Sequence, residues 1–278
     1  MIMQKENIIV LGDIDKQLLG LTDQHIHYLT SKRLVNESLT NDNAIGAVQA
    51  SSKPQIGIHQ QMCTAFEALR KSAETAGIEL KIASGFRSFE RQLQIWNNKF
   101  IGNTAIKKTN GEIVDISRLS DWQIIEAILL YSALPGASRH HWGSDIDVYA
   151  PNLLASGESL QLEPWEYQES GPMEKLSTWL TQHAADFGFY LPYDCFRGGI
   201  AEEPWHLSFA PLAKQYQATF TLKALHDCLL NSDIAGKTVI IENLTEIAQR
   251  YINNTNTSDL SLIQSQQEMT KQNRTTHG

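Results

Sequence analysis

Apolar residues recur at regular spacing through the middle of the chain. Five of them fall at intervals of three and four and would form one face of a helix: Ile58, Met62, Phe66, Leu69 and Ala73. Gly77 is the expected end of this helix. Residues 78–83 then alternate apolar and polar side chains, which is typical of a strand with one buried face. The pattern therefore predicts a helix from residue 58 and a strand that leads into a loop at 84–88.

The same reasoning predicts a series of further short elements. Helices are expected at 89–100, 121–134, 173–187 and 211–230, and strands at 146–149, 188–191 and 205–209. Residues 238–252 begin like a strand and continue with a helical pattern, so both types stay open there. Residues 151–172 are rich in loop signals. This mixture predicts an α+β fold, with a small, mostly antiparallel sheet flanked by helices.

The pattern also divides the chain into four parts. The expected parts are an N-terminal arm at 1–55, a compact domain at 56–212, a helical extension at 213–252 and a polar tail at 253–278. The tail holds 16 Asn, Gln, Ser or Thr among its 26 residues. Such a segment buries too little apolar surface to offset the entropy of ordering, and it is predicted to be disordered.

Composition narrows the functional class. The 278 residues are 42% hydrophobic, and 23 Lys and Arg against 31 Asp and Glu give a net charge of −8. An acidic chain does not favour nucleic acid as a partner. Three cysteines cannot all pair, which favours a reducing compartment. No signal peptide or membrane-spanning stretch is visible, so we expect a cytoplasmic protein without a membrane span, with the periplasm as the alternative.

Three segments gather side chains that could perform chemistry. They are Ser84–Ser88, residues 135–147 and Glu203–His206. In the second segment His140 and Asp147 lie seven residues apart, and Gly143 between them would permit a turn into the strand that carries Asp147. One imidazole and one carboxylate could therefore meet at this point.

A second imidazole comes from the third segment. His206 lies on a predicted strand, three residues after Glu203. Two histidines and one aspartate are a three-ligand set for Zn²⁺ that leaves a fourth position for water. A nearby carboxylate that does not bind the metal is what a hydrolase needs as a general base. Each segment alone is more often structural, and the remaining histidines are expected to be structural or on the surface.

The three segments together resemble the motifs of the VanY-like zinc D-Ala-D-Ala carboxypeptidases, which are LAS-type metallopeptidases. Ser138-x-His140-x-x-Gly143-x-x-x-Asp147 is similar to their S-x-H-x-x-G-x-A-x-D motif. Glu203-Pro204-Trp205-His206 resembles their E-P-W-H motif, and Ser84-Gly85-Phe86-Arg87-Ser88 resembles their S-G-Y-R-S loop. The likeness covers about residues 79–210, so it implies a zinc carboxypeptidase-like domain at 56–212.

This resemblance implies roles for six residues. His140, Asp147 and His206 would bind Zn²⁺, and Glu203 would be the general base. Arg87 would stabilise the oxyanion and the terminal carboxylate of the substrate, because a guanidinium is always charged and can bond in bidentate fashion. Ser138 would donate a hydrogen bond to the substrate. The implied partner is a peptidoglycan stem peptide or muropeptide.

Some positions depart from the motif or leave a choice. Asp145 would face the same side of a strand as Asp147, so it could either accept a hydrogen bond from a zinc-bound imidazole or replace Asp147 as ligand. His141 would point elsewhere than His140. Spacing to His206 favours Glu203 over Glu202 as the base. Phe86 stands where the family usually has Tyr.

Three functions follow from these residues. The favoured one is hydrolysis of the terminal D-Ala-D-Ala bond of stem peptides. The same centre could serve an L,D-carboxypeptidase or a peptidoglycan endopeptidase. A non-catalytic zinc-containing peptidoglycan-binding module is the alternative of another class, but pure binding would need neither Glu203 nor Arg87. The oligomeric state stays open.

Overall fold

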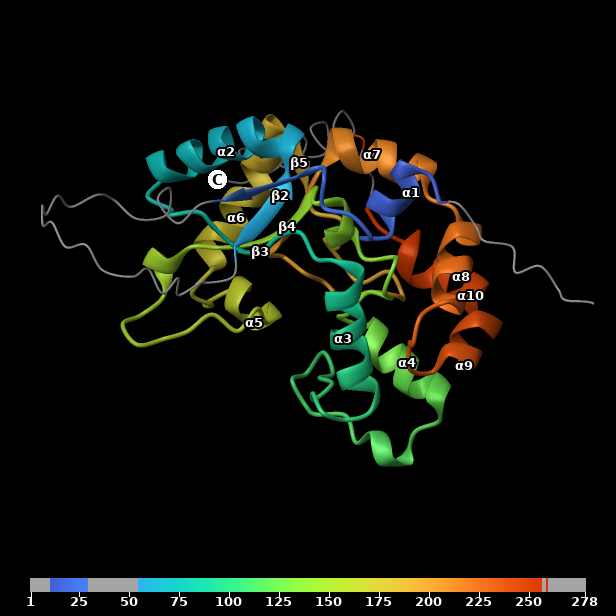
Figure 1. The fold of residues 1–278 in the computed structure, drawn as a ribbon. Helices are drawn as coiled ribbons and strands as arrows, with labels where there is room; N and C mark the ends of the chain where they lie inside the picture. The colour runs from blue at the N-terminus through green and yellow to red at the C-terminus, as the bar shows by residue number, and fades with distance from the viewer. Residues whose placement is uncertain (1–10, 30–54, 257–258, 260–278) are drawn as a thin grey trace, which may run out of the picture.

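The computed structural model describes residues 11–29, 55–256 and 259 and has an α+β architecture (Figure 1). One two-stranded sheet pairs β1 (Ile26–Leu29) with β2 (Ile56–His59). The larger sheet has the order β3-β4-β6-β5, and every neighbouring pair is antiparallel. Its strands are Lys81–Ser84, Asp145–Tyr149, His206–Phe209 and Phe189–Tyr190 for β3, β4, β6 and β5. The expected small antiparallel sheet is thus confirmed.

Helices pack in two groups (Figure 1). The first group includes α2 (Cys63–Thr75), α6 (Glu174–His183) and α7 (Ala210–Thr219), which share a core with the larger sheet. The second group forms its own core from α3 (Phe89–Phe100), α4 (Asp121–Leu129), α8 (Leu222–Leu230), α9 (Lys237–Glu242) and α10 (Leu244–Ile247). Two shorter helices are α1 (Asp13–Leu18) and α5 (Pro164–Tyr167).

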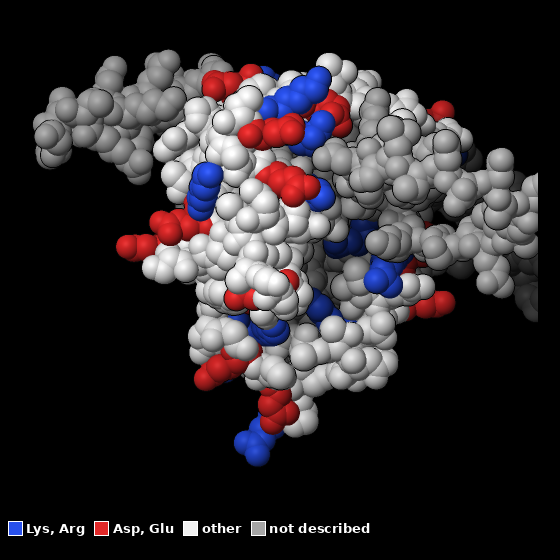
Figure 2. All heavy atoms as spheres, turned by 90° about the vertical axis from the view of Figure 1, so that its left-hand side faces the viewer, with Lys and Arg blue, Asp and Glu red and all other residues white. Residues whose placement is uncertain are grey.

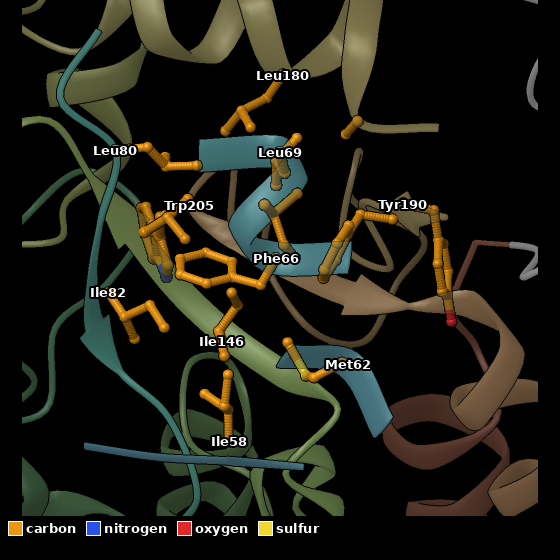
Figure 3. Packing of buried hydrophobic residues seen from close by; sticks show 14 of the residues in the cluster. Ile58, Met62, Phe66, Leu69, Leu80, Ile82, Ile146, Leu180, Tyr190 and Trp205 are labelled. Carbon is orange, nitrogen blue, oxygen red and sulfur yellow. The ribbon is translucent and has the colours of Figure 1, made fainter. Parts of the chain in front are cut away.

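The larger sheet has one apolar and one polar face. Ile146 on β4 lies in the same core cluster as Phe66 and Leu69 of α2 and Leu180 of α6 (Figure 3). Successive side chains of a strand point to opposite faces, so Asp145 and Asp147 face away from this core. The apolar face thereby anchors β4, and its other face is left for polar side chains.

The structure moves the start of one predicted helix and resolves the open choice at 238–252 as helical. The helix expected from Ile58 begins at Cys63, because residues 56–59 form β2 and pair with β1. Ile58 is buried in both arrangements, so apolar spacing alone could not separate them. His59 ends the strand by accepting a hydrogen bond from the Gln61 backbone N–H, which starts a 3₁₀ turn before α2. The strand-like start at 239–241 lies within α9.

Parts of both ends of the chain belong to the described residues. Residues 13–18 and 26–29 of the expected arm form α1 and β1, and Leu18 and Leu19 are buried. Most of the expected disordered tail lies outside the described residues. No disulfide links the three cysteines, all of which are described.

The charged side chains and the helix lengths are relevant to what a charged partner or a membrane would require. On the face drawn in Figure 2, Lys and Arg are interspersed with Asp and Glu. Within the described ranges, no helix combines the length and the apolar character needed to cross a bilayer.

Candidate metal centre and cleft

Strand register brings distant parts of the chain together on the polar face. Asp147 lies directly opposite His206 on β6, and on its other side it lies opposite Ser84 on β3. Residues opposite each other in an antiparallel pair have Cβ atoms about 4.5–5.5 Å apart. Asp145 is paired in the same way with Ser208. The sheet thus places the second and third motifs side by side, with the end of the first motif's strand beside them.

His140 reaches the sheet from a 3₁₀ turn at Arg139–Trp142. The turn ends at Gly143, whose φ of 68° lies in the left-handed region. A Cβ at Gly143 would lie 2.3 Å from Cδ1 of Ile26 and 3.1 Å from the His59 backbone nitrogen, so a larger residue would also have to displace its neighbours. Nδ1 of His140 lies 2.9 Å from the Gly85 carbonyl oxygen, which can only accept a hydrogen bond. The proton is therefore on Nδ1, and Nε2 is free to bind a metal.

The geometry of three side chains fits a metal ion. His140, Asp147 and His206 each offer an atom, and these atoms all lie within 4.8 Å of one another. Nε2 of His140 is 3.4 Å from Oδ2 of Asp147, and Nδ1 of His206 is 3.3 Å from Oδ1 of Asp147. Two ligands about 2.0–2.1 Å from a tetrahedral Zn²⁺ are separated by about 3.4 Å.

Unsatisfied polar atoms support the same conclusion. Oδ1 of Asp147 and Nδ1 of His206 are buried and make no hydrogen bond of good geometry. Leaving such atoms unpaired costs about 1–3 kcal/mol each. A cation held between them would satisfy both, so the donor set fits the zinc ion that the sequence predicts.

Asp145 orients His206 and does not belong to the metal-binding group. Its Oδ1 accepts a hydrogen bond from Nε2–H of His206 at 3.0 Å, which leaves Nδ1 of that ring facing Asp147. Its Oδ2 accepts from Ser144 and Ser208 at 2.7 and 3.1 Å. Of the two carboxylates left open by the sequence, the geometry favours Asp147 as the ligand and gives Asp145 the supporting role.

Arg139 balances the charge of Asp145, a role that no sequence pattern predicted. The pair is fully buried, and Nε–H of Arg139 donates to Oδ1 of Asp145 at 2.7 Å. Burial alone would raise the pKa of Asp145, but the Arg139 guanidinium and the hydrogen bond from His206 lower it to about 2. Arg139 also donates to Tyr190 and Ser208. These contacts hold the Asp145 carboxylate in place, and that carboxylate in turn orients the His206 ring.

Glu203 lies beside the three-residue group without being part of it. Its Oε2 is 3.3 Å from Nδ1 of His206, and the side chain is buried in the cleft. Glu202 is exposed and does not line the cleft. Burial opposes the charged form of His206, yet the hydrogen bond to Asp145 and the nearby carboxylates of Asp147 and Glu203 raise its pKa well above the ordinary value. The site therefore attracts positive charge strongly.

Arg87 is held over the cleft by neutral partners. Its guanidinium donates to Oε1 of Gln92 at 2.9 Å and to Oγ of Ser84 at 3.0 Å. Burial lowers the pKa of Arg87, while the charges of Asp147 and Glu203 act in the opposite direction. Since a guanidinium stays protonated at any ordinary pH, Arg87 presents a fixed positive charge beside the two carboxylates.

His141 positions this loop and stays neutral. It is fully buried, its Nδ1–H donates to the Arg87 carbonyl at 2.6 Å, and its Nε2 accepts from the Gly136 backbone N–H at 3.0 Å. Burial lowers its pKa to about 3. As expected from sequence, the ring points away from His140.

These residues share one cleft with a volume of about 360 Å³. All six predicted site residues line it: Arg87, Ser138, His140, Asp147, Glu203 and His206. Lys99 and Tyr193 also line it and were not predicted. The Tyr193 ring lies edge-on to the His206 ring, with centroids 4.9 Å apart. Neither residue belongs to a motif, so only the folded chain could reveal them.

Gln92 was also missed, although the sequence held a signal for it. In the predicted helix at 89–100, Gln92 falls three residues after Phe89 and four before Trp96, on the same face. A polar residue among apolar neighbours needs a buried partner, and Gln92 is fully buried between Arg87 and the Ala133 carbonyl.

Comparisons with known proteins identify the family of this chain. A family profile for VanY, described as D-alanyl-D-alanine carboxypeptidase, matches residues 55–212. An uncharacterised protein of Haemophilus influenzae is 38% identical over 121 residues, which cover 43% of this chain and 92% of that protein. A D-alanyl-D-alanine carboxypeptidase of Enterococcus faecalis is 24% identical over 141 residues, covering 50% of this chain and 42% of the relative.

A solved structure of VanYB in complex with D-alanine-D-alanine is 20% identical, with a TM-score of 0.42, and the match covers 70% of this chain and 93% of that one. The family match itself spans more than half of the chain and includes all three motifs that form the cleft. The chain is therefore a peptidase that belongs to the VanY family of D-alanyl-D-alanine carboxypeptidases.

Proposed function

We propose that this chain is a zinc-dependent carboxypeptidase that removes the terminal D-alanine from peptidoglycan stem peptides ending in D-Ala-D-Ala. The observation that carries the proposal is the buried His140, Asp147 and His206 group, with Glu203 beside it in the same cleft. The family match supports the reaction class, and the E. faecalis relative carries the same activity in its name.

The three side chains suit a zinc ion, and their number determines what the ion can do. Two imidazole nitrogens and one carboxylate suit Zn²⁺ with one coordination position open. When bound, the ion polarises a carbonyl and lowers the pKa of water to about 7. The chain contributes the orientation of the ligands: Gly85 holds His140, and Asp145 holds His206.

Glu203 is placed to move protons during peptide hydrolysis. Its carboxylate accepts a proton from the attacking water and returns it to the amine of the leaving D-residue. Both transfers require a carboxylate that is not itself bound to metal. Glu203 meets this condition, because it lies outside the three-residue group and within 3.3 Å of Nδ1 of His206.

Arg87 and Ser138 complete the reaction site. The Arg87 guanidinium is fixed by Gln92 and Ser84, so it needs little reorganisation when negative charge develops on the peptide oxygen. Ser138 lines the same cleft and offers a hydroxyl to the bound peptide. Both residues bind parts of the substrate that carry or develop charge.

Mass spectrometry of defined peptides tests the proposal. The purified chain would be incubated with a pentapeptide stem that ends in D-Ala-D-Ala and with the tetrapeptide that lacks the last residue. We expect release of one D-alanine from the pentapeptide, loss of release with a chelator, and recovery with added Zn²⁺. Release from the tetrapeptide alone would make the chain an L,D-carboxypeptidase, and release from neither would refute the proposal.

A further inference from the structure

Lys99 is a cation in the cleft that the mechanism above does not use. It lies in the last turn of α3, half-buried, and its Nζ donates to Oγ of Ser132 at 2.6 Å. Its side chain lines the same cleft as Arg87 and Glu203.

The charges that line the cleft are unevenly paired. Arg139 pairs with Asp145, and Lys107 pairs with Glu163. Across the described ranges, Arg87 and Lys99 have no carboxylate within 4 Å and bond only to neutral groups. Asp147 and Glu203 line the same cleft but do not bond to either cation, so Arg87 and Lys99 can both take a carboxylate of a ligand as a directly bonded partner.

Among the charged groups around Lys99, Glu203 interacts with it favourably. Burial lowers the pKa of Lys99, the positive charge of Arg87 lowers it further, and only Glu203 acts in the opposite direction. Under the proposed function, Glu203 returns a proton to the leaving amine, so the leaving C-terminal residue must lie next to Glu203. A cation near both Arg87 and Glu203 is therefore close to the carboxylate of that residue.

Stabilisation of a helix end is the competing explanation. Lysine in the last turn of a helix interacts favourably with the carbonyls there, and Lys99 is in such a place. A solvent-facing lysine would have the same effect. The side chain instead enters the cleft, where Arg87 repels it and Ser132 fixes it, so a helix-end role does not explain its direction.

We propose that Lys99 is a specificity-determining residue that binds, together with Arg87, the free α-carboxylate of the peptide's C-terminal residue. This inference rests on the proposed function. It adds the residue that makes the cleft prefer a peptide with a free C-terminal carboxylate. A charge-assisted hydrogen bond from an ammonium to a carboxylate strengthens binding by roughly 10- to 100-fold.

The test compares a free carboxylate with an amide. Steady-state kcat and KM would be measured for the zinc-loaded parent and Lys99→Met, each with a pentapeptide ending in D-Ala-D-Ala and with its C-terminal amide. We expect Lys99→Met to raise KM for the acid by roughly 10- to 100-fold and to change the amide little. Lys99→Arg, which retains the charge, should recover part of the loss.

A matched control separates this role from stability. Lys237→Met removes a lysine that also bonds to a neutral group, the Leu230 carbonyl at 3.1 Å, outside the cleft. It should leave both substrates unchanged. Lys99→Met should not lower the melting temperature, since it removes a charge that Arg87 repels. An equal loss for acid and amide, or no loss for the acid, would overturn the proposal.

A binding measurement keeps the inference testable if the reaction is different. If the parent hydrolyses neither peptide, the proposed function fails. Calorimetry with D-alanyl-D-alanine and its amide then tests Lys99 alone. Tighter binding of the acid by the parent that disappears in Lys99→Met supports the carboxylate site, and equal binding of acid and amide by the parent refutes it.

Discussion

Asp145→Asn tests the support of the metal centre more sharply than removal of a ligand does. The carboxylate is fully buried and accepts four hydrogen bonds, two on each oxygen. Asparagine has nearly the same shape. Its oxygen can keep Arg139 and His206, while its NH₂ faces Ser144 and Ser208, whose hydroxyls can turn to accept. The substitution therefore removes charge and leaves the geometry nearly intact.

The substitution should change both the affinity for zinc and the stability of the fold. Loss of a group that orients a metal-bound imidazole lowers metal affinity about 10- to 100-fold, which is about 1.4–2.7 kcal/mol. Breaking the buried pair with Arg139 leaves a guanidinium without a counter-charge, which costs about 3–5 kcal/mol in unfolding free energy. The hydrogen bonds that asparagine retains place the expected cost at the lower end of that range.

Zinc competition against a chromophoric chelator measures the affinity, and denaturant unfolding of the metal-free protein measures the stability. Glu126→Gln is the control, because it breaks the ion pair with Arg250 away from the cleft. That variant should bind zinc as the parent does. Unchanged zinc affinity in Asp145→Asn would refute the supporting role. Complete loss of zinc, with Asp147→Asn still binding it, would make Asp145 the ligand.

Three further predictions concern catalysis and pH. Glu203→Gln should retain zinc while kcat falls about 10²- to 10⁴-fold, as measured by metal analysis and D-alanine release; full activity would exclude Glu203 as the base. Arg87→Lys keeps the charge but loses the planar fork, so kcat should fall about 10²- to 10³-fold; a rise in KM alone would limit Arg87 to ground-state binding. Burial lowers the pKa of His59 to about 4, so the unfolded chain takes up a proton at higher pH than the folded one. Stability should therefore fall as pH drops from about 6.5 towards 4, and His59→Gln should lessen this fall in thermal melts; an unchanged pH dependence would contradict the argument.

The sequence predicted the two strands that carry Asp147 and His206 closely. The expected strands at 146–149 and 205–209 coincide closely with β4 and β6, and Asp145 and Asp147 share one face of β4 as the two-residue period predicted. Short motifs at fixed spacing were enough for this, because a strand's two-residue period determines which side chains share a face.

Other features depended on contacts between distant segments. β2 forms because residues 26–29 pair with it, and no local pattern at 56–59 shows that partner. The local sequence around Arg139 does not show its partner. Asp145 meets Arg139 only because the chain reverses at Gly143. Lys99 enters the cleft only because α3 packs beside α4, whose following loop supplies Ser132.

Zinc-edge anomalous diffraction from crystals of the zinc-loaded chain tests the central claim most directly. The claim is that His140, Asp147 and His206 bind one catalytic zinc ion while Asp145 and Glu203 stay off the metal. We predict one strong peak per chain, about 2.0–2.2 Å from Nε2 of His140, a carboxylate oxygen of Asp147 and Nδ1 of His206. A peak elsewhere, a peak bound to Asp145, or no peak in this cleft would contradict the account.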